Sequence, residues 1–147
     1  MKDMKDEKRN DLPHYEITGQ ILNCCFEVIK ELGSGFQERI YKNALLITLR
    51  QKGLQVDIEQ PFEVSYRGTM IGRYYADLVV NKMVIVELKC CESLVLEHQA
   101  QLFNYLKVSS LPVGLLVNFR RRKLEYKRLH RNENYEGDEI MMDQVRL

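Results

Sequence analysis

The sequence predicts one α/β domain, a mixed β-sheet flanked by α-helices, and three observations support this fold. Apolar residues recur at helical spacing over residues 15–32 and 37–52. From residue 56 to residue 89 the apolar period changes to two, which is typical of β-strands. A third helical segment, residues 94–109, lies between two apolar runs. A helical crossover of this kind makes the two strands that it joins parallel.

Glycines bound the first two helices. Apolar residues from Ile17 to Leu32 mark one face of the first helix, and Gly33-Ser34-Gly35 ends it because glycine readily adopts the left-handed conformation. The second helix is predicted from about Gln37 to Lys52, and Gly53 ends it. Its inward-facing residues are expected to be Ile40, Ala44 and Ile47.

The predicted strands are separated by turn residues. Strands are expected over residues 56–58, 62–66, 70–80, 83–89, 114–117 and 124–129. Turns are expected at Arg67-Gly68 and at Asn81-Lys82. Because the helix over 94–109 joins strands 83–89 and 114–117, we expect that pair to be parallel and the rest of the sheet to be antiparallel.

The length of 147 residues is usual for one compact domain. Residues 1–13 are expected to be a flexible leader, residues 14–131 a single domain, and residues 132–147 a polar C-terminal tail. No apolar run reaches the roughly 20 residues that cross a bilayer, and residues 1–11 lack the apolar core of a signal peptide. We therefore expect a cytoplasmic protein with no membrane partner.

The overall charge does not indicate a nucleic-acid-binding protein, because 22 basic and 21 acidic residues leave a net charge of +1. A local patch can still hold a polyanion. The run Arg120, Arg121, Arg122 and Lys123 is either a solvated turn between two strands or a nucleic-acid contact, and Lys127, Arg128 and Arg131 extend it.

The four cysteines occur as two adjacent pairs, Cys24-Cys25 and Cys90-Cys91. Zinc ligands are usually spaced two to four residues apart, and neighbouring side chains diverge on both helices and strands. We therefore expect structural cysteines.

Two carboxylates, Asp77 and Glu87, lie inside runs that otherwise have the pattern of buried strands. A carboxylate in such a place must be paired, hydrogen-bonded or bound to a cation. Glu87 and Lys89 share one strand face with Ile85, while the alternate residues Val84, Val86 and Leu88 face the core. The three polar residues form either a metal site or a buried cluster in which Lys89 neutralises the two carboxylates.

The register of the hairpin decides whether the carboxylates meet. A two-residue loop would pair Val80 with Met83 and place Asp77 and Glu87 on opposite faces. A three-residue loop or a bulge pairs Val80 with Val84 instead and places Asp77 across from Glu87. Directly opposite Cβ atoms lie about 4.5–5.5 Å apart, close enough for two carboxylates to share one ion. We predict this second register.

The segment from Asp77 to Glu87-Leu88-Lys89 resembles the core motif of the PD-(D/E)XK nuclease superfamily. The proline in the name of the superfamily is absent, because Ala76 precedes Asp77.

Two flanking motifs resemble those of the GxxExxY proteins, a prokaryotic group within the same superfamily. The first is the spacing Gly35…Glu38…Tyr41, which places Glu38 in the first turn of a helix, where the helix dipole favours a carboxylate. The second is one helix stripe formed by His98, Gln101 and Tyr105. Each motif alone also fits an ordinary helix flank. The resemblance extends from about Ile17 to Leu129.

The resemblance implies a restriction-endonuclease-like fold and cleavage of a phosphodiester in DNA or RNA. It implies that Asp77 and Glu87 bind Mg²⁺ or Mn²⁺, hard ions that prefer oxygen ligands. The carbonyl of Leu88 would be a further ligand, and Glu38 would complete the metal shell directly or through water.

The remaining residues of the implied catalytic set are Lys89, Gln101 and Tyr105. Lys89 would orient the attacking water or help to deprotonate it, and would stabilise charge on the phosphate. Gln101 and Tyr105 would position a phosphate or a base.

The small size and near-neutral charge leave little surface for gripping a duplex, so we expect weak autonomous binding, a homodimer or a protein partner. Two alternatives to a nuclease remain open. One is a catalytically silent nuclease-fold module that binds nucleic acid or a protein. The other is a phosphohydrolase that acts on small nucleotides.

Overall fold

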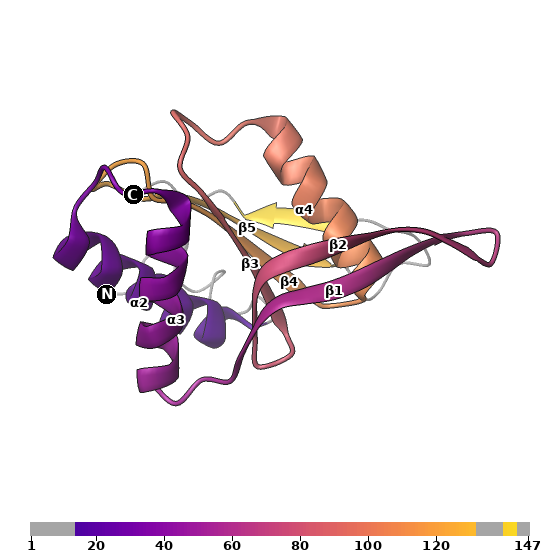
Figure 1. The fold of residues 1–147 in the computed structure, drawn as a ribbon, viewed down its shortest axis with the longest axis horizontal. Coiled ribbons are helices and arrows are strands. Elements are labelled where there is room, and N and C mark those ends of the chain that lie inside the picture. Colours follow the sequence, from indigo (N-terminus) through magenta and orange to yellow (C-terminus); the bar gives the residue numbers. More distant parts are fainter. Residues whose placement is uncertain (1–13, 132–139, 144–147) are drawn as a thin grey trace, which may run out of the picture.

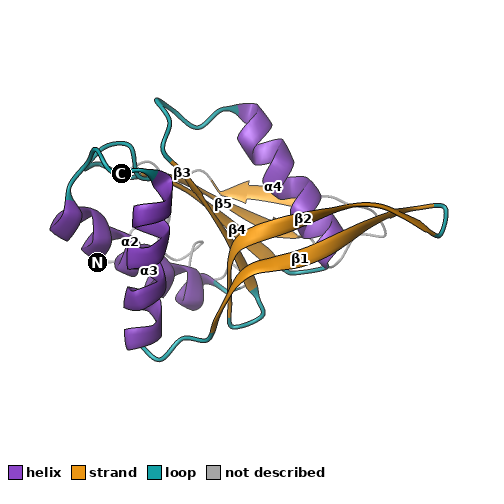
Figure 2. Ribbon diagram, in the orientation of Figure 1, coloured by secondary structure: helices purple, strands orange, loops and turns teal. Residues whose placement is uncertain are grey.

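The computed structural model describes residues 14–131 and 140–143 (Figures 1 and 2). The predicted leader, residues 1–13, and most of the predicted tail, residues 132–139 and 144–147, lie outside this part of the chain. The helices are α2 (Tyr15–Leu32), α3 (Glu38–Gln51) and α4 (Leu96–Ser109). The strands are β1 (Val56–Tyr66), β2 (Thr69–Val80), β3 (Val84–Lys89), β4 (Val113–Asn118), β5 (Glu125–Arg131) and β6 (Ile140–Asp143).

Within the described residues the strands form one sheet in the order β1-β2-β3-β4-β5-β6. The pair β3 and β4 is parallel and the other neighbouring pairs are antiparallel, which confirms the predicted topology. The mixed sheet with flanking helices confirms the predicted fold class. No helix in the described ranges is long and apolar enough to span a membrane.

Helices cover both faces of the sheet. Helices α2 and α3 pack on the face that carries Val84, Val86 and Leu88, whereas α4 packs on the face that carries Ile85 (Figure 1). This alternation along β3 confirms the predicted assignment of its two faces. Glu87 and Lys89 alternate with the same core residues and therefore share the α4 side with Ile85.

The buried face of α3 differs from the prediction. Ile40 and Ile47 are 37% and 59% exposed, so the expected inward position of these two residues is wrong, whereas Ala44 packs partly buried against the core. The fully buried residues are Tyr41, Leu45 and Leu49. The two stripes start one residue apart on the helix and are both apolar, so periodicity alone does not distinguish them.

Contacts of Tyr41 fix the rotation of α3. Its hydroxyl donates a 2.6 Å hydrogen bond to the carbonyl of Gly33 and accepts one of 3.2 Å from the amide of Phe36. The ring stacks on Phe119, which directly follows β4, with a centroid distance of 5.1 Å. Tyr41 thereby fastens the segment before Glu38 and brings the start of α3 to the carboxyl end of β4.

Two strands differ from the sequence pattern. Strand β1 continues through Pro61, which is tolerated because β1 is an edge strand. Strand β6 pairs with β5 within the segment predicted as a polar tail. Its four residues are too few to produce a clear alternation in the sequence.

Candidate active site

Asp77 and Glu87 come together across β2 and β3. The backbone pairs Val80 with Val84 and Leu78 with Val86 around a turn at Asn81–Met83, which confirms the predicted register. Extending that register places Asp77 opposite Glu87. The two carboxylates therefore lie between the same two strands rather than on opposite faces of the sheet.

The carboxylates replace backbone pairing where β2 and β3 separate. The regular ladder ends at Leu78 and Val86. Beyond it, the amide of Asp77 donates a 3.3 Å hydrogen bond to Oε1 of Glu87, and the amide of Leu88 donates one of 2.9 Å to Oδ2 of Asp77. Each carboxylate is thus held by a main-chain donor of the opposite strand, which fixes its position in the gap.

Burial and mutual repulsion oppose the ionisation of both members of this pair together. Glu87 is only 9% exposed, and burial, together with the charge of Asp77, raises its pKa to about 9. Partial desolvation and then the charge of Asp77 raise the pKa of Glu38. Lys89 acts in the opposite direction on both glutamates, and its charge does not offset the other two effects. A further cation would therefore stabilise the ionised site.

Sequence reasoning missed two charged residues at the site, Lys42 and Glu59. The ammonium of Lys42, on α3, lies 3.3 Å from Oε1 of Glu59 and 3.9 Å from Oδ1 of Asp77. Lys42 follows Glu38 by one helical turn, so the i,i+4 spacing could have indicated it. Glu59 had no such signal, because its place in β1 has the pattern of a solvent-facing strand residue.

Of the predicted α4 residues His98, Gln101 and Tyr105, Tyr105 has the clearest link to the carboxylate pair. Its ring stacks on Tyr74 at 3.6 Å and 6°, and burial, then the charges of Glu87 and Asp77, raise its pKa. Gln101 is exposed. His98 accepts a 3.1 Å hydrogen bond at Nδ1 from the amide of Val95, so this nitrogen supports the first turn of α4.

The basic run forms the exposed turn between β4 and β5. Because β3 and β4 are parallel, this turn lies at the same sheet edge as Lys89. The turn borders a cavity of about 240 Å³. The lining consists of Glu92, Ser93, Asn118, Arg120, Arg121, Lys123 and Glu125.

Lys127 and Arg128 are buried, so the expected extension of the exposed patch through them is wrong. Their alternating neighbours on β5 are buried as well, and the guanidinium of Arg128 lies 4.8 Å from the ring centre of Tyr15.

A polar network holds the loop that follows Lys89 against this turn. The side chain of Asn118 donates to the carbonyl of Cys91 at 2.8 Å and accepts from the amide of Cys91 at 3.1 Å. Glu125 accepts from the amide of Leu94 at 2.6 Å and from Asn118 at 3.3 Å. Cys24 and Cys25 are buried and Cys90 and Cys91 half-buried, all four as free thiols. The loop is therefore ordered by hydrogen bonds and not by a disulfide.

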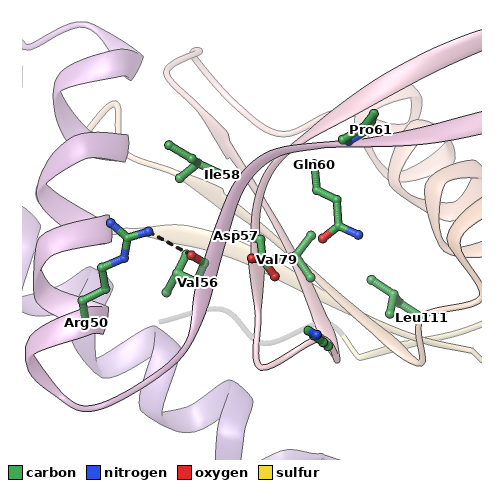
Figure 3. A pocket seen from close by; sticks show the side chains of 9 residues that line it. Arg50, Val56, Asp57, Ile58, Gln60, Pro61, Val79 and Leu111 are labelled. Carbon is green, nitrogen blue, oxygen red and sulfur yellow. Dashed lines mark hydrogen bonds between the residues drawn. The ribbon is translucent and has the colours of Figure 1, made fainter.

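A larger cavity of about 670 Å³ lies elsewhere, along β1 and the turn between β2 and β3 (Figure 3). Its lining consists of Arg50, Val56, Asp57, Ile58, Gln60, Pro61, Val79, Lys82 and Leu111. The side chain of Arg50 donates a 3.0 Å hydrogen bond to the carbonyl of Val56 at one end of it. Neither Asp77 nor Glu87 lines this cavity, so the cavity is separate from the candidate site.

The family model of the PD-(D/E)XK nuclease superfamily matches residues 15–129. This chain belongs to the PD-(D/E)XK nuclease superfamily. The match confirms the resemblance inferred from Asp77 and Glu87-Leu88-Lys89 at the level of the superfamily. Membership of the GxxExxY group stays a prediction.

The chain is also similar to a protein of known structure, described as the crystal structure of SSO0001. The TM-score is 0.51 at 22% sequence identity, and the similarity covers 61% of this chain. The matched part spans about half of that protein, 48% of its length. At this identity the likeness supports the fold alone. No protein with a curated description matches the chain.

Nucleases of this superfamily generally use divalent metal ions, and the donor chemistry of the site fits such an ion. Asp77 and Glu87 offer two adjacent carboxyl groups whose joint ionisation a bound cation would favour, and hard cations prefer oxygen ligands. Over residues 14–131 and 140–143, no three His, Cys, Asp or Glu side chains lie close enough together to hold an ion. Glu38 lies near enough to the pair for the charge of Asp77 to raise its pKa.

Proposed function

We propose that this protein is a metal-dependent nuclease-type phosphodiesterase that acts on DNA or RNA. The observation that carries the proposal is the meeting of Asp77 and Glu87 across two strands, with Lys89 on the same strand face as Glu87. A purely structural ion pair is most stable when its charges balance. The raised pKa of Glu87 means instead that its ionised form lacks a sufficient compensating positive charge in the metal-free protein.

Asp77 and Glu87 would hold Mg²⁺ or Mn²⁺, with the carbonyl of Leu88 as a further ligand. Glu38 would complete the metal shell directly or through water. When bound, the ion supplies charge neutralisation at the scissile phosphate. Lys89 would hold the attacking water by hydrogen bonding and stabilise the developing negative charge on phosphate oxygens.

Substrate contacts would come from α4 and from the basic turn. Tyr105 would position a phosphate or base through its hydroxyl or ring, and Gln101 would act from the exposed side of the same helix. Arg120, Arg121, Arg122 and Lys123 would bind the backbone of the nucleic acid. Because these cations are few, we infer that a homodimer or a protein partner supplies the rest of the surface that binds a duplex. A cytoplasmic location remains an expectation.

The test of this function is cleavage of single- and double-stranded DNA and RNA with Mg²⁺ or Mn²⁺. We expect cleavage of at least one polymer with the ion and none with a chelator. Binding of nucleic acid without cleavage would favour the catalytically silent module. Hydrolysis of free nucleotides without cleavage of any polymer would favour the phosphohydrolase.

Neutralising the basic turn should weaken nucleic-acid binding without abolishing metal binding. We expect the triple variant Arg120→Ala, Arg121→Ala and Lys123→Ala to bind less tightly. Each lost phosphate contact should also reduce the slope of log affinity against log salt concentration by about 0.9 for duplex DNA. Fluorescence anisotropy over a salt series measures both effects.

The matched control removes three exposed lysines from other surfaces, with Lys30, Lys52 and Lys82 each changed to Ala. It alters the net charge equally. Equal weakening in the two triple variants would show that the effect is one of overall charge, and would remove the basic turn from the proposed interface.

A further inference from the structure

Lys42 lies between two carboxylates, those of Glu59 and Asp77, that differ in their exposure to solvent. Its ammonium is 3.3 Å from Glu59 and 3.9 Å from Asp77. The side chains of Lys42 and Asp77 are 18% and 22% exposed, whereas that of Glu59 is 70% exposed. Solvent therefore screens the interaction with Asp77 less than the interaction with Glu59. Lys42 also follows Glu38 by one turn of α3, and its charge partly opposes the rise in the pKa of Glu38 that burial and Asp77 cause.

The backbone at Glu59 is unusual. The pairing of β1 with β2 passes from Ile58 and Leu78 to Gln60 and Ala76, which leaves Glu59 opposite Asp77 at an interruption of the ladder. Glu59 has a φ of 48°, a left-handed conformation inside a β-strand. Non-glycine residues occupy this region at a cost and persist there only where the surrounding structure imposes it. This conformation accompanies the contact of its carboxylate with Lys42.

We propose that Lys42 is a built-in counter-ion of Asp77 that competes with the divalent metal, and that Glu59 holds the ammonium partly away from Asp77. This inference rests on the metal site of the proposed function. Lys42 acts as a positioning residue, because it would act on the ion through its contacts with Asp77 and Glu59. The ammonium occupies the neighbourhood of Asp77 and is shared with Glu59 at a shorter distance.

The two residues should therefore change metal affinity in opposite directions. Lys42→Met removes a like charge beside the ion and keeps the length of the side chain. We expect its Mn²⁺ affinity to rise about fivefold, the scale of one partly screened ion pair. Glu59→Gln frees Lys42 to neutralise Asp77, so its Mn²⁺ affinity should fall by a similar factor. Calorimetric titration with Mn²⁺ measures both.

A double variant separates the action of Glu59 through Lys42 from its own charge. In the Lys42→Met background, Glu59→Gln should change the Mn²⁺ affinity by less than about twofold, because the ammonium that it would release is gone. An undiminished effect would mean that Glu59 acts directly on the ion, which contradicts its proposed role.

Two control variants complete the experiment. Lys52→Met breaks a 3.2 Å pair with Glu27, whose side chains are 55% and 52% exposed, and should leave the affinity unchanged. Lys42→Arg retains the charge and should bind Mn²⁺ like the wild-type protein. The rise in melting temperature caused by Mn²⁺ should also be larger in Lys42→Met than in the wild-type protein, which checks folding and binding together.

The outcomes distinguish this inference from the proposed function. An unchanged or lower affinity in Lys42→Met, with normal Mn²⁺ binding by the wild-type protein, overturns the counter-ion role and leaves the metal site intact. Binding by Lys42→Met but not by the wild-type protein supports the role in its strongest form. Absence of binding in both proteins overturns the metal site itself, and the role of Lys42 with it.

Discussion

Glu87→Ala and Lys89→Ala are expected to cleave nucleic acid at least about a hundredfold more slowly than the wild-type protein, the usual effect of losing a group that acts in proton transfer or charge stabilisation. The physical reasons differ between the two variants. Glu87→Ala removes one of the two adjacent carboxylates that would hold the ion. Lys89→Ala keeps both carboxylates and removes the cation proposed to act on the attacking water and the phosphate.

Cleavage rates at saturating Mn²⁺, compared with metal binding, separate these two causes. Glu87→Ala should lose both activity and metal binding, whereas Lys89→Ala should lose activity and still bind the ion. Glu97→Ala and Lys82→Ala are suitable controls, because both side chains are exposed and lie outside the site. Equal residual activity in wild type and in both site variants would reject the assignment.

Metal affinity should increase steeply with pH. In the metal-free protein the pKa of Glu87 is raised to about 9 by burial and by the charge of Asp77. Ligands must lose their protons to bind a metal ion, so an ion competes with a proton at Glu87 throughout the neutral range. We expect Mn²⁺ affinity to rise about tenfold per pH unit between about pH 6 and pH 8. Binding of the ion should release one proton from the protein. Calorimetry in buffers with different ionisation enthalpies measures that proton.

The same carboxyl group links the stability of the metal-free protein to pH. The folded protein retains a proton on Glu87 that the unfolded chain releases near the ordinary pKa of 4.5. Because the folded state then binds more protons, the free energy of unfolding falls as pH rises from about 5 towards about 9. Glu87→Gln should remove this contribution and give a flatter profile. A metal affinity that does not vary over this pH range would contradict the buried, protonated state of Glu87.

Local sequence rules predict the centre of the site well. The face of β3 follows from the alternation of its side chains, and the register follows from requiring Asp77 and Glu87 to meet. The residues Asn81 and Lys82 provide the turn, with φ angles of 50° and 53°. Asparagine tolerates the left-handed region better than most residues, whereas the lysine there is imposed by the turn.

Other features depend on tertiary contacts that periodicity does not contain. Tyr41 selects the buried face of α3 through its contacts with Gly33 and Phe119. Lys127 and Arg128 belong to a basic sequence, yet both are buried on β5. Long side chains can bury their apolar stems in this way, so a run of basic residues in the sequence does not establish an exposed basic patch.

The Lys42–Glu59 pair was missed for a related reason. It joins residues from a helix and a strand that are 17 positions apart, and it depends on a left-handed residue within a strand. A period-two pattern treats Glu59 as an ordinary exposed position. The sequence therefore predicts the meeting of Asp77 and Glu87 better than it predicts the charges that surround them.

Calorimetric titration of Mn²⁺ into the wild-type protein and into Asp77→Ala tests the metal site most directly, because it requires no knowledge of the substrate. Asp57→Ala, which removes an aspartate of β1 that lines the larger cavity, is the matched control. We predict that the wild-type protein and Asp57→Ala bind the ion and that Asp77→Ala does not. Equal binding by the wild-type protein and Asp77→Ala, or no binding by the wild-type protein and none by Lys42→Met, would contradict a metal centre at Asp77 and Glu87.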